Sequence, residues 1–328
     1  MFLVVYTLPA VCGRGFFFIK YLMDTVIITG GTGLIGSALS KFLVSRSYQV
    51  IIFTREPRSH RSSVPGISYA AWNIDEQSVN EEAFRKAKYV IHLAGAGVAD
   101  KPWTAKRKKE IVESRTKSSA LLIRAMESIP NEIVSVVSAS AIGWYKQNLS
   151  HQSIETEPPA EDFLGETCVA WENAIKPVRE LGKNLVILRT GIVLSNEGGA
   201  FPSFKKPVQY GIAGILGSGK QMISWIHIED LCRLYMEAMV NQSWSGIYNA
   251  VAPNPVNNRN FTIGLAKKMK GSFFIPIPLP NFILRLMLGD RSEEVLKNSN
   301  VSANKLKQQG FQFIYPTIDT AFRDLIER

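Results

Sequence analysis

The stretch from Val26 to Gly36 constrains the fold of this chain more than any other. A β-branched apolar run ends in three spaced glycines, Gly30, Gly33 and Gly36, and residues 37–43 then repeat apolar side chains with a helical period. This order predicts a strand, a tight turn and a helix. In such a turn the first glycine permits the bend, the second lets backbone N–H groups approach a phosphate, and the third lets the helix pack closely. The free N–H groups at the helix start then favour a bound anion.

The end of the next apolar run, residues 49–55, indicates which phosphate-containing ligand would fit. This run arrives at the spacing of a β-α-β unit and finishes with Thr54 and Arg55. Here an acidic residue would hydrogen-bond the ribose 2′-hydroxyl of NAD, whereas a basic residue accommodates the 2′-phosphate of NADP. Arg55, with Arg58 and Arg61 close behind, therefore favours NADP(H) over NAD(H). The alternative is a glycine turn in an unrelated α/β protein with surface arginines.

Strand-like and helix-like segments alternate through the first two thirds of the chain. This alternation predicts an α/β fold built on a Rossmann-like, doubly wound parallel sheet. In such sheets ligands bind beyond the carboxyl ends of the strands, which is where small and polar residues gather in this sequence. We expect helices within residues 81–88, 105–128 and 162–182, and strands within 26–29, 49–55, 67–72, 89–97, 132–137, 185–190 and 246–250.

Composition divides the chain into three parts. Residues 1–22 are apolar and aromatic, and we interpret them as an extension outside the fold, because Met23 lies just before the first strand. Residues 23–250 form the expected nucleotide-binding domain, with a lid-like insertion at about 196–222, where glycines and prolines predict a long loop region. Residues 251–328 are expected to form a small C-terminal α/β domain over the mouth of the sheet.

Charge and cysteine content narrow the class of protein. The 328 residues are 46% hydrophobic and 20% charged, which is ordinary for a globular protein. The net charge is +10, but its basic residues are scattered apart from Lys101–Lys109, so we expect a small anionic ligand and no nucleic acid. Cys12, Cys168 and Cys232 are too few and too far apart for a disulfide framework or a metal site, and they fit a reducing cytoplasm. No uninterrupted membrane-spanning run is expected, and the oligomeric state stays open.

Three motifs follow the ends of predicted strands: TGGTGLIG at residues 29–36, HLAG at 92–95 and SAS at 138–140. With them the chain resembles the short-chain dehydrogenase/reductase superfamily, in its extended branch of NAD(P)-dependent epimerases and dehydratases. Longer segments resemble the atypical "epimerase family" proteins of unassigned substrate in that branch. These segments are SASAIGWY (138–145), RTGIVL (189–194), GSGKQMISWIHIEDL (217–231) and NAVAPNP (249–255). The resemblance implies a small C-terminal domain, here from about Phe274.

The resemblance also implies a nicotinamide dinucleotide cofactor and, by position, the residues that hold it. The expected cofactor-binding residues lie at the glycine turn and at the ends of the second, fourth and fifth predicted strands. They are Gly30, Thr32, Gly33, Leu34, Ile35, Gly36, Arg55, Leu93, Ala94, Gly95 and Ser138.

The usual proton-transfer pair of the superfamily is missing. Members carry Tyr-x-x-x-Lys on the helix after the fifth strand, and a Ser or Thr at the end of that strand orients the substrate oxygen. Ser140 matches the hydroxyl, but no tyrosine of this chain has a lysine four residues later. Two substitutes are Tyr145, on the same loop as Ser140, and Glu166, near the place of the missing tyrosine. The alternatives are a strand-capping serine, a packing aromatic and a solvent-facing helix acid.

Two arginines extend the list of candidates. Arg189 either binds a substrate phosphate or pairs with a neighbouring acid. Arg115 lies near the place where extended members of the superfamily have a residue facing the cofactor, but the preferred interpretation is an exposed helix arginine.

Two functions follow as hypotheses. The first is an NADP(H)-binding, epimerase/dehydratase-like oxidoreductase acting on a small metabolite, with an anionic substrate as one option. The second is a non-catalytic NADP(H)-sensing regulatory protein. An enzyme predicts a closed pocket over the nicotinamide, lined by Ser140, Arg189 and residues 217–227.

Overall fold

The computed structural model describes residues 23–327, apart from residues 61, 148–149 and 293–295. The expectations for residues 1–22, including Cys12, therefore lie outside the described residues, as does Arg61. A sheet of eight strands runs through the molecule in the order β13-β7-β6-β5-β1-β2-β3-β4. Its strands are β1 (Thr25–Thr29), β2 (Gln49–Thr54), β3 (Ile67–Asn73), β4 (Ser78–Val79), β5 (Tyr89–His92), β6 (Ser135–Ala141), β7 (Asn184–Thr190) and β13 (Gly246–Ala250).

Every pair in this sheet is parallel except β3 with β4, which confirms the doubly wound α/β fold. The chain moves outward from β1 to β2 and β3, then returns to place β5 on the other side of β1. The strand order thus reverses between β1 and β5. In open parallel sheets a ligand site forms beyond the carboxyl ends of the strands at such a reversal.

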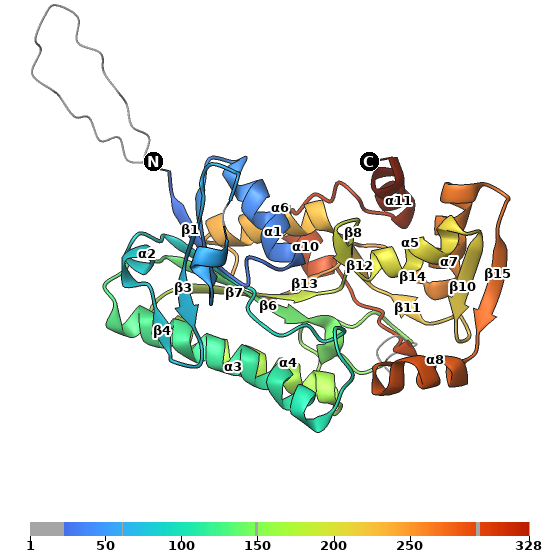
Figure 1. Cartoon of the computed structure of the whole chain (residues 1–328), viewed down its shortest axis with the longest axis horizontal. Coiled ribbons are helices and arrows are strands. Elements are labelled where there is room, and N and C mark those ends of the chain that lie inside the picture. The colour runs from blue at the N-terminus through green and yellow to red at the C-terminus, as the bar shows by residue number, and fades with distance from the viewer. Residues whose placement is uncertain (1–22, 61, 148–149, 293–295, 328) are drawn as a thin grey trace, which may run out of the picture.

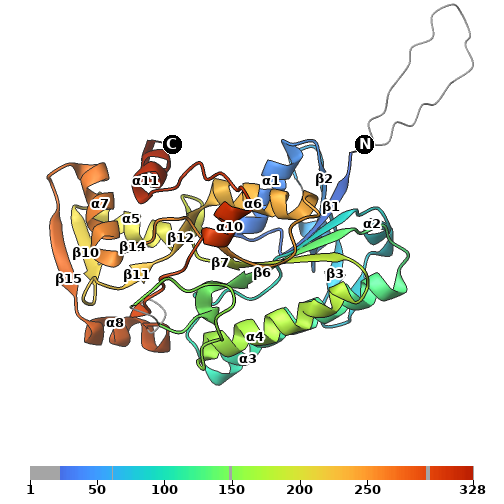
Figure 2. The same ribbon diagram turned by 180° about the vertical axis from the view of Figure 1, so that it is seen from behind.

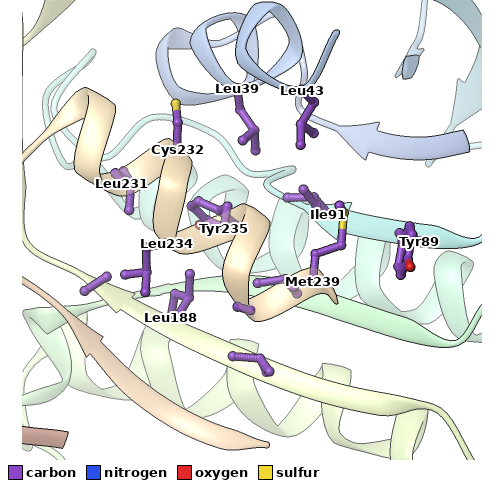
Figure 3. Packing of buried hydrophobic residues seen from close by; sticks show 14 of the residues in the cluster. Leu39, Leu43, Tyr89, Ile91, Leu188, Leu231, Cys232, Leu234, Tyr235 and Met239 are labelled. Carbon is purple, nitrogen blue, oxygen red and sulfur yellow. The ribbon is translucent and has the colours of Figure 1, made fainter. Parts of the chain in front are cut away.

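Helices cover both faces of the sheet, as Figures 1 and 2 show. One face packs against α1 (Leu34–Val44) and α6 (Ile228–Val240). Figure 3 shows this core, in which Leu39 of α1 and Tyr235 of α6 approach Ile91 of β5. The other face packs against α2 (Glu81–Arg85), α3 (Ala105–Ser128) and α4 (Phe163–Ile175). Short 3₁₀ turns occupy Pro57–Ser59, Ile142–Trp144, Lys176–Arg179 and Gly289–Arg291.

A second group of elements lies beyond one end of the large sheet (Figure 1) and has its own apolar core, which includes Phe201, Phe261 and Phe322. The helices of this group are α5 (Phe201–Gln209), α7 (Asn258–Lys270), α8 (Asn281–Leu288) and α11 (Ile318–Glu327). The short helix α10 (Asn304–Gln308) instead packs on β13, and its Leu306 joins the core of the large sheet that includes α1 and α6. Its strands are β8 (Ile192–Ser195), β9 (Gly198–Gly199), β10 (Ile212–Leu216), β11 (Met222–Ile223), β12 (Trp225–His227), β14 (Val256–Asn257) and β15 (Ile275–Leu279).

The sequence predicts a long loop between Gly191 and Met222, and this prediction is wrong. This segment contains β8, α5 and β10. Pro202 stands in the first turn of α5, where a missing N–H costs nothing, and Pro207 lies close to the end of the helix. Strand β10 forms a parallel pair with β15, from Ile212 opposite Ile275 to Leu216 opposite Leu279. The insertion therefore packs with the C-terminal elements, while the proposed domain boundaries at 250 and 251 stay a prediction.

Buried polar contacts fix the C-terminal segment to the nucleotide-binding part. Asp230, fully buried near the start of α6, accepts hydrogen bonds from the backbone N–H groups of Ile314 and Tyr315. The Lys297 ammonium, also buried, donates to Asp162, the residue that caps the N-terminus of α4. Among the helices that the structure describes, none has the length and apolar character needed to cross a bilayer.

Candidate cofactor site and the buried network beside it

The glycine turn between β1 and α1 excludes side chains at two positions. Gly30 has a φ of +70°, and a Cβ there would lie 2.7 Å from the carbonyl oxygen of Leu93. A Cβ at Gly36 would lie 2.5 Å from the carbonyl oxygen of Gly30. Gly33 differs, because it is exposed and a Cβ there would approach no atom closer than 3.4 Å. The packing of the protein itself does not require glycine at this position, which is consistent with close approach of a ligand.

The start of α1 is suited to an anion. Gly33 precedes the helix and has no side chain with which to cap it, and no acidic residue occupies the first turn. The N–H groups at Leu34 and Ile35 therefore belong to the unsatisfied donors of a helix N-terminus. These donors and the helix dipole together favour a phosphate at this point. The cradle fits the pyrophosphate of a dinucleotide.

The segment after β5 lies against this turn and is fastened to it by a buried network. Ala94 N–H donates to Thr29 Oγ1 (3.3 Å), which is also 2.8 Å from Nδ1 of His92. The other ring nitrogen of His92 lies 3.2 Å from the Ser119 hydroxyl on α3. Burial lowers the pKa of His92 to about 4, so the ring is neutral at physiological pH. The two loops expected to bind a cofactor thus share one set of hydrogen bonds.

A polar cavity of about 320 Å³ lies between the turn, α1 and the segment after β2. Arg55 is exposed at the end of β2, three residues beyond Ile52, which lines the cavity. None of the described lining residues is acidic. The lining includes Thr32, which the sequence predicts as a cofactor-binding residue. Its other hydroxyl and basic side chains, which sequence reasoning did not single out, are Ser37, Ser40, Lys41, His60, Ser62, Ser63 and Tyr69.

A second polar network is buried at the carboxyl ends of β6, β7 and β13. The Ser140 hydroxyl donates to Glu172 Oε1 (2.7 Å). Arg189 binds both carboxylate oxygens of Glu172, at 2.8 and 3.0 Å, and its Nη1 donates to the Tyr145 hydroxyl (3.0 Å). Tyr145 in turn donates to Asn249 Oδ1 (2.6 Å). All five side chains are at least 97% buried.

This network shows how several predicted residues are placed. Of the two interpretations of Arg189, pairing with a neighbouring acid is the observed one. Burial raises the pKa of Tyr145 to about 12, which disfavours loss of its proton near neutral pH. Ser138 is fully buried, and its hydroxyl donates to the carbonyl of Ala139 (3.2 Å). Ser140 and Tyr145 are thus brought into one cluster, whereas Glu166 is exposed in the first turn of α4.

The face of α4 that meets the loop after β6 carries Leu164 and Cys168, four residues apart. A Cβ at Gly143 would lie 3.2 Å from Leu164 Cβ and 3.8 Å from Cys168 Sγ. The Cys168 thiol donates weakly to the carbonyl of Ala141 (3.6 Å). These two residues have the i, i+4 spacing of Tyr-x-x-x-Lys, but they are a leucine and a cysteine. Burial raises the pKa of the Cys168 thiol to about 12.

The position of Arg115 differs from the one expected from the sequence. It is buried in α3, with 8% of its surface exposed, although the preferred interpretation of the sequence is an exposed helix arginine. Its Nη1 donates to the carbonyl oxygens of Ala96 (3.0 Å) and Ile111 (2.8 Å). The only sequence signal for this placement was its match to a cofactor-facing position in extended members of the superfamily.

Among the described residues, no group of three or more His, Cys, Asp or Glu side chains could hold a metal ion.

The chain belongs to the NAD-dependent epimerase/dehydratase family, whose model matches residues 26–250. A second match, to a domain of unknown function (DUF1731), covers residues 279–325. Members of the first family use a nicotinamide dinucleotide, and the glycine cradle at Gly30–Gly36 fits that group.

Curated relatives extend this assignment over almost the whole chain. Epimerase family protein SSP1921 of Staphylococcus saprophyticus is 36% identical over 305 residues, which cover 93% of this chain and 100% of the relative. Epimerase family protein SAOUHSC_00792 of Staphylococcus aureus is also 36% identical, over 307 residues with the same coverage.

Solved structures agree on the fold. Human epimerase family protein SDR39U1 (isoform 2), crystallised with NADPH, superimposes with a TM-score of 0.81 at 26% identity, covering 93% of this chain and 99% of the human one. A Thermus thermophilus UDP-glucose 4-epimerase in complex with NAD gives a TM-score of 0.73 at 20% identity, with 92% and 98% covered. The second likeness concerns the fold alone.

Proposed function

We propose that this protein binds NADP(H) in preference to NAD(H) and acts as an epimerase/dehydratase-like oxidoreductase on a small, anionic metabolite. The observation that carries the cofactor preference is the polar cavity beside the glycine turn, whose described lining includes Lys41 and His60 but no acid. Arg55 stands at the end of β2, where an acidic residue would select NAD. The human relative crystallised with NADPH supports the same choice. Free, buried thiols at Cys168 and Cys232 favour a reducing cytoplasm.

The proposal gives each part of the site a task. N–H groups at Leu34 and Ile35 hold the pyrophosphate, and Leu93–Gly95 form the adjoining wall of the cleft. Arg55 and the cavity lining take the 2′-phosphate through charge-assisted hydrogen bonds. When bound, a nicotinamide cofactor supplies or accepts a hydride. Ser140 lies at the end of β6, where it would orient a substrate oxygen. Its hydroxyl donates a hydrogen bond to Glu172.

Binding measurements on the purified protein test the cofactor preference. We expect the Kd for NADPH to be at least tenfold lower than that for NADH, and Arg55→Glu to reverse the order, because a carboxylate repels the 2′-phosphate and accepts from a ribose hydroxyl. Arg58→Glu, three residues further along the exposed segment, is the matched control and should change the ratio less. Equal affinities for the two cofactors, unaffected by Arg55→Glu, would remove the assignment.

A second function has a specific observation in its favour. The face of α4 toward the loop after β6 presents Leu164 and Cys168, neither a tyrosine nor a lysine, and the Tyr145 hydroxyl is already bound to Arg189 and Asn249. A protein that binds NADP(H) without turning over a substrate, and so senses the cofactor for a regulatory partner, also fits this arrangement.

Turnover separates the two functions. We expect NADPH oxidation with at least one member of a library of small carbonyl compounds, weighted toward carboxylates and phosphates. Ser140→Ala should lower the rate while leaving the Kd for NADPH unchanged. Tyr145→Phe and Glu166→Gln would then show whether either side chain moves a proton. Tight NADPH binding without turnover of any compound would favour the sensor.

A further inference from the structure

Large apolar side chains are exposed where β10, β15 and α8 meet the solvent, at the end of the molecule opposite β3 and β4. Strand β15 forms the outer edge of the molecule in both overall views, and α8 follows it at the same end (Figures 1 and 2). The exposed side chains, which we call the apolar face, are Tyr210, Ile212, Phe273, Ile275, Ile277, Phe282 and Leu286. Phe273 and Leu286 are each 87% exposed. Single exposed apolar residues are ordinary, but a group of them on neighbouring elements marks an interaction site.

The pairing of β10 with β15 explains why these side chains point outward. Ala213 of β10 is fully buried in the core that β10 shares with α5 and α7. Because side chains alternate along a strand, Ile212 points to the opposite face. Ile212 pairs with Ile275, and Gly214 with Ile277, so both isoleucines of β15 share this outer face. The sheet therefore turns one face toward the core and the apolar face toward the solvent.

The chain around the apolar face is basic and contains no carboxylate side chains. Residues 198–228 and 258–289 supply its elements, and together they contain eight lysines and arginines but no aspartate or glutamate. The next acidic residue, Asp290, faces Lys108 of α3 (3.4 Å). Three of the basic residues flank the apolar face in the sequence and are at least partly exposed: Lys267, Lys270 and Arg285. The partner that fits this end of the molecule is therefore anionic as well as apolar.

The free edge of β15 is unsuited to a further strand. The N–H of Ile275 donates to the carbonyl of Gly211 (2.8 Å), so the backbone of this residue faces β10. Successive residues of a strand direct their backbone groups to opposite edges, which places Pro276 and Pro278 at the free edge. Proline has no N–H to donate, so an added strand would lack two hydrogen bonds. A partner must therefore use the side chains of the apolar face.

A second copy of the chain is a poor occupant of this face. A two-fold contact brings the same surface of both subunits together. The three flanking cations would then approach their own copies, and neither acid-free stretch supplies a carboxylate to compensate them. Like charges brought together in a desolvated contact cost free energy. A lipid surface with negative headgroups instead offers anions for the cations and acyl chains for the apolar side chains.

We propose that the apolar face binds the surface of a lipid bilayer that contains anionic headgroups. Phe273, Phe282 and Leu286 enter the boundary between headgroups and acyl chains, and the three flanking cations contact lipid phosphates. Phe282 and Leu286 are four residues apart on α8 and so lie on one side of this helix. The protein lies on the membrane without crossing it. This inference goes beyond the proposed function and does not depend on it.

Flotation of the full chain with lipid vesicles measures this interaction. One set of vesicles contains phosphatidylcholine alone, and the other contains phosphatidylcholine and phosphatidylglycerol in equal parts. The apolar variant combines Phe282→Gln with Leu286→Gln. Its matched control is Ile154→Gln, which replaces an exposed isoleucine on the loop after β6.

A second pair of variants tests the contribution of charge. The basic variant combines Lys267→Gln, Lys270→Gln and Arg285→Gln. Its control lowers the net charge equally at α2 and α3, by Lys86→Gln, Lys117→Gln and Arg124→Gln, all three at exposed positions.

We expect the wild type to float with the phosphatidylglycerol vesicles and to bind phosphatidylcholine at least about tenfold more weakly, because each cation near an anionic surface changes the partition coefficient roughly fivefold. The apolar variant should lower the partition coefficient at least about tenfold, since two apolar side chains leave the interface. The basic variant should weaken binding to the phosphatidylglycerol vesicles, as should added salt. Both controls should stay within about threefold of the wild type, because their substitutions lie away from the apolar face.

A wild type that floats with neither set of vesicles would overturn the proposal. An apolar variant that binds as tightly as the wild type would do the same, and would place the membrane contact elsewhere, for example at the apolar residues 1–22. Should the apolar variant not fold, Phe273→Gln with Ile275→Gln tests the same face. Light scattering that shows a wild-type dimer, and a monomer for the apolar variant, would assign the face to a second copy and contradict the proposal.

Discussion

Glu172 of α4 joins the side chains of Ser140 on β6 and Arg189 on β7, and Arg189 extends the network to Tyr145 and from there to Asn249. Sequence reasoning gave Ser140 and Tyr145 reactive roles, because their types and positions match the superfamily. It could not foresee their partners, since Glu172 lies 32 residues beyond Ser140 and reaches it only through the packing of α4 on β6. Whether Ser140, Tyr145 or Glu166 moves a proton stays a prediction.

Glu172→Gln should destabilise the fold by about 3 kcal/mol or more, because it leaves the Arg189 guanidinium buried without a counter-charge. Chemical denaturation with a constant m-value measures this loss of unfolding free energy. Glu166→Gln, on the exposed face of the same helix, should change it by less than about 0.5 kcal/mol. Equal effects of the two substitutions would contradict the buried placement of Glu172.

Substitutions at two glycines of the turn should affect stability and NADPH binding separately. Gly36→Ala should cost roughly 1–3 kcal/mol of stability, because its Cβ would meet the backbone of Gly30 and Gly31 at 2.5 Å. Gly33→Ala should keep stability within about 1 kcal/mol and yet weaken NADPH binding at least tenfold, because the methyl group would stand where a phosphate approaches. Thermal unfolding and NADPH titration of both variants check this. A Gly33→Ala protein with wild-type affinity would place the phosphate elsewhere.

His92 of β5 contacts Thr29 on β1 and Ser119 on α3. We therefore expect the stability of the fold to depend on pH through His92. The pKa of His92 in the folded protein is about 4, below its ordinary 6.5, so the unfolded chain takes up a proton that the folded chain does not. This contribution to stability is complete above pH 6.5 and is lost as the pH falls toward 4, by about 3 kcal/mol in total. The dependence of unfolding free energy on pH in this window should be shallower for His92→Gln than for the wild type. Identical slopes for the two proteins would contradict a lowered pKa of His92 in the folded state.

Across the whole molecule, the parallel sheet and the glycine turn were predictable because local patterns encode them. Residues 105–128 and 246–250 form α3 and β13 as expected. The segment after Gly191 was not predictable from local patterns. Its helix α5 contains two prolines, and its strand β10 pairs with β15, which begins 59 residues after the end of β10. The buried position of Arg115 was equally hidden, since a helix rich in charged residues gives no sign of which of them face inward.

The central claim is that a dinucleotide lies across the reversal of strand order, with its pyrophosphate at the start of α1 and its 2′-phosphate near Arg55. A crystal structure of the protein grown with NADPH tests this claim most directly. We expect the pyrophosphate within hydrogen-bonding distance of the N–H groups at Leu34 and Ile35, and the 2′-phosphate between Arg55 and the cavity lined by Lys41 and His60. Well-ordered crystals grown in saturating NADPH that show this cleft without the cofactor would contradict the account.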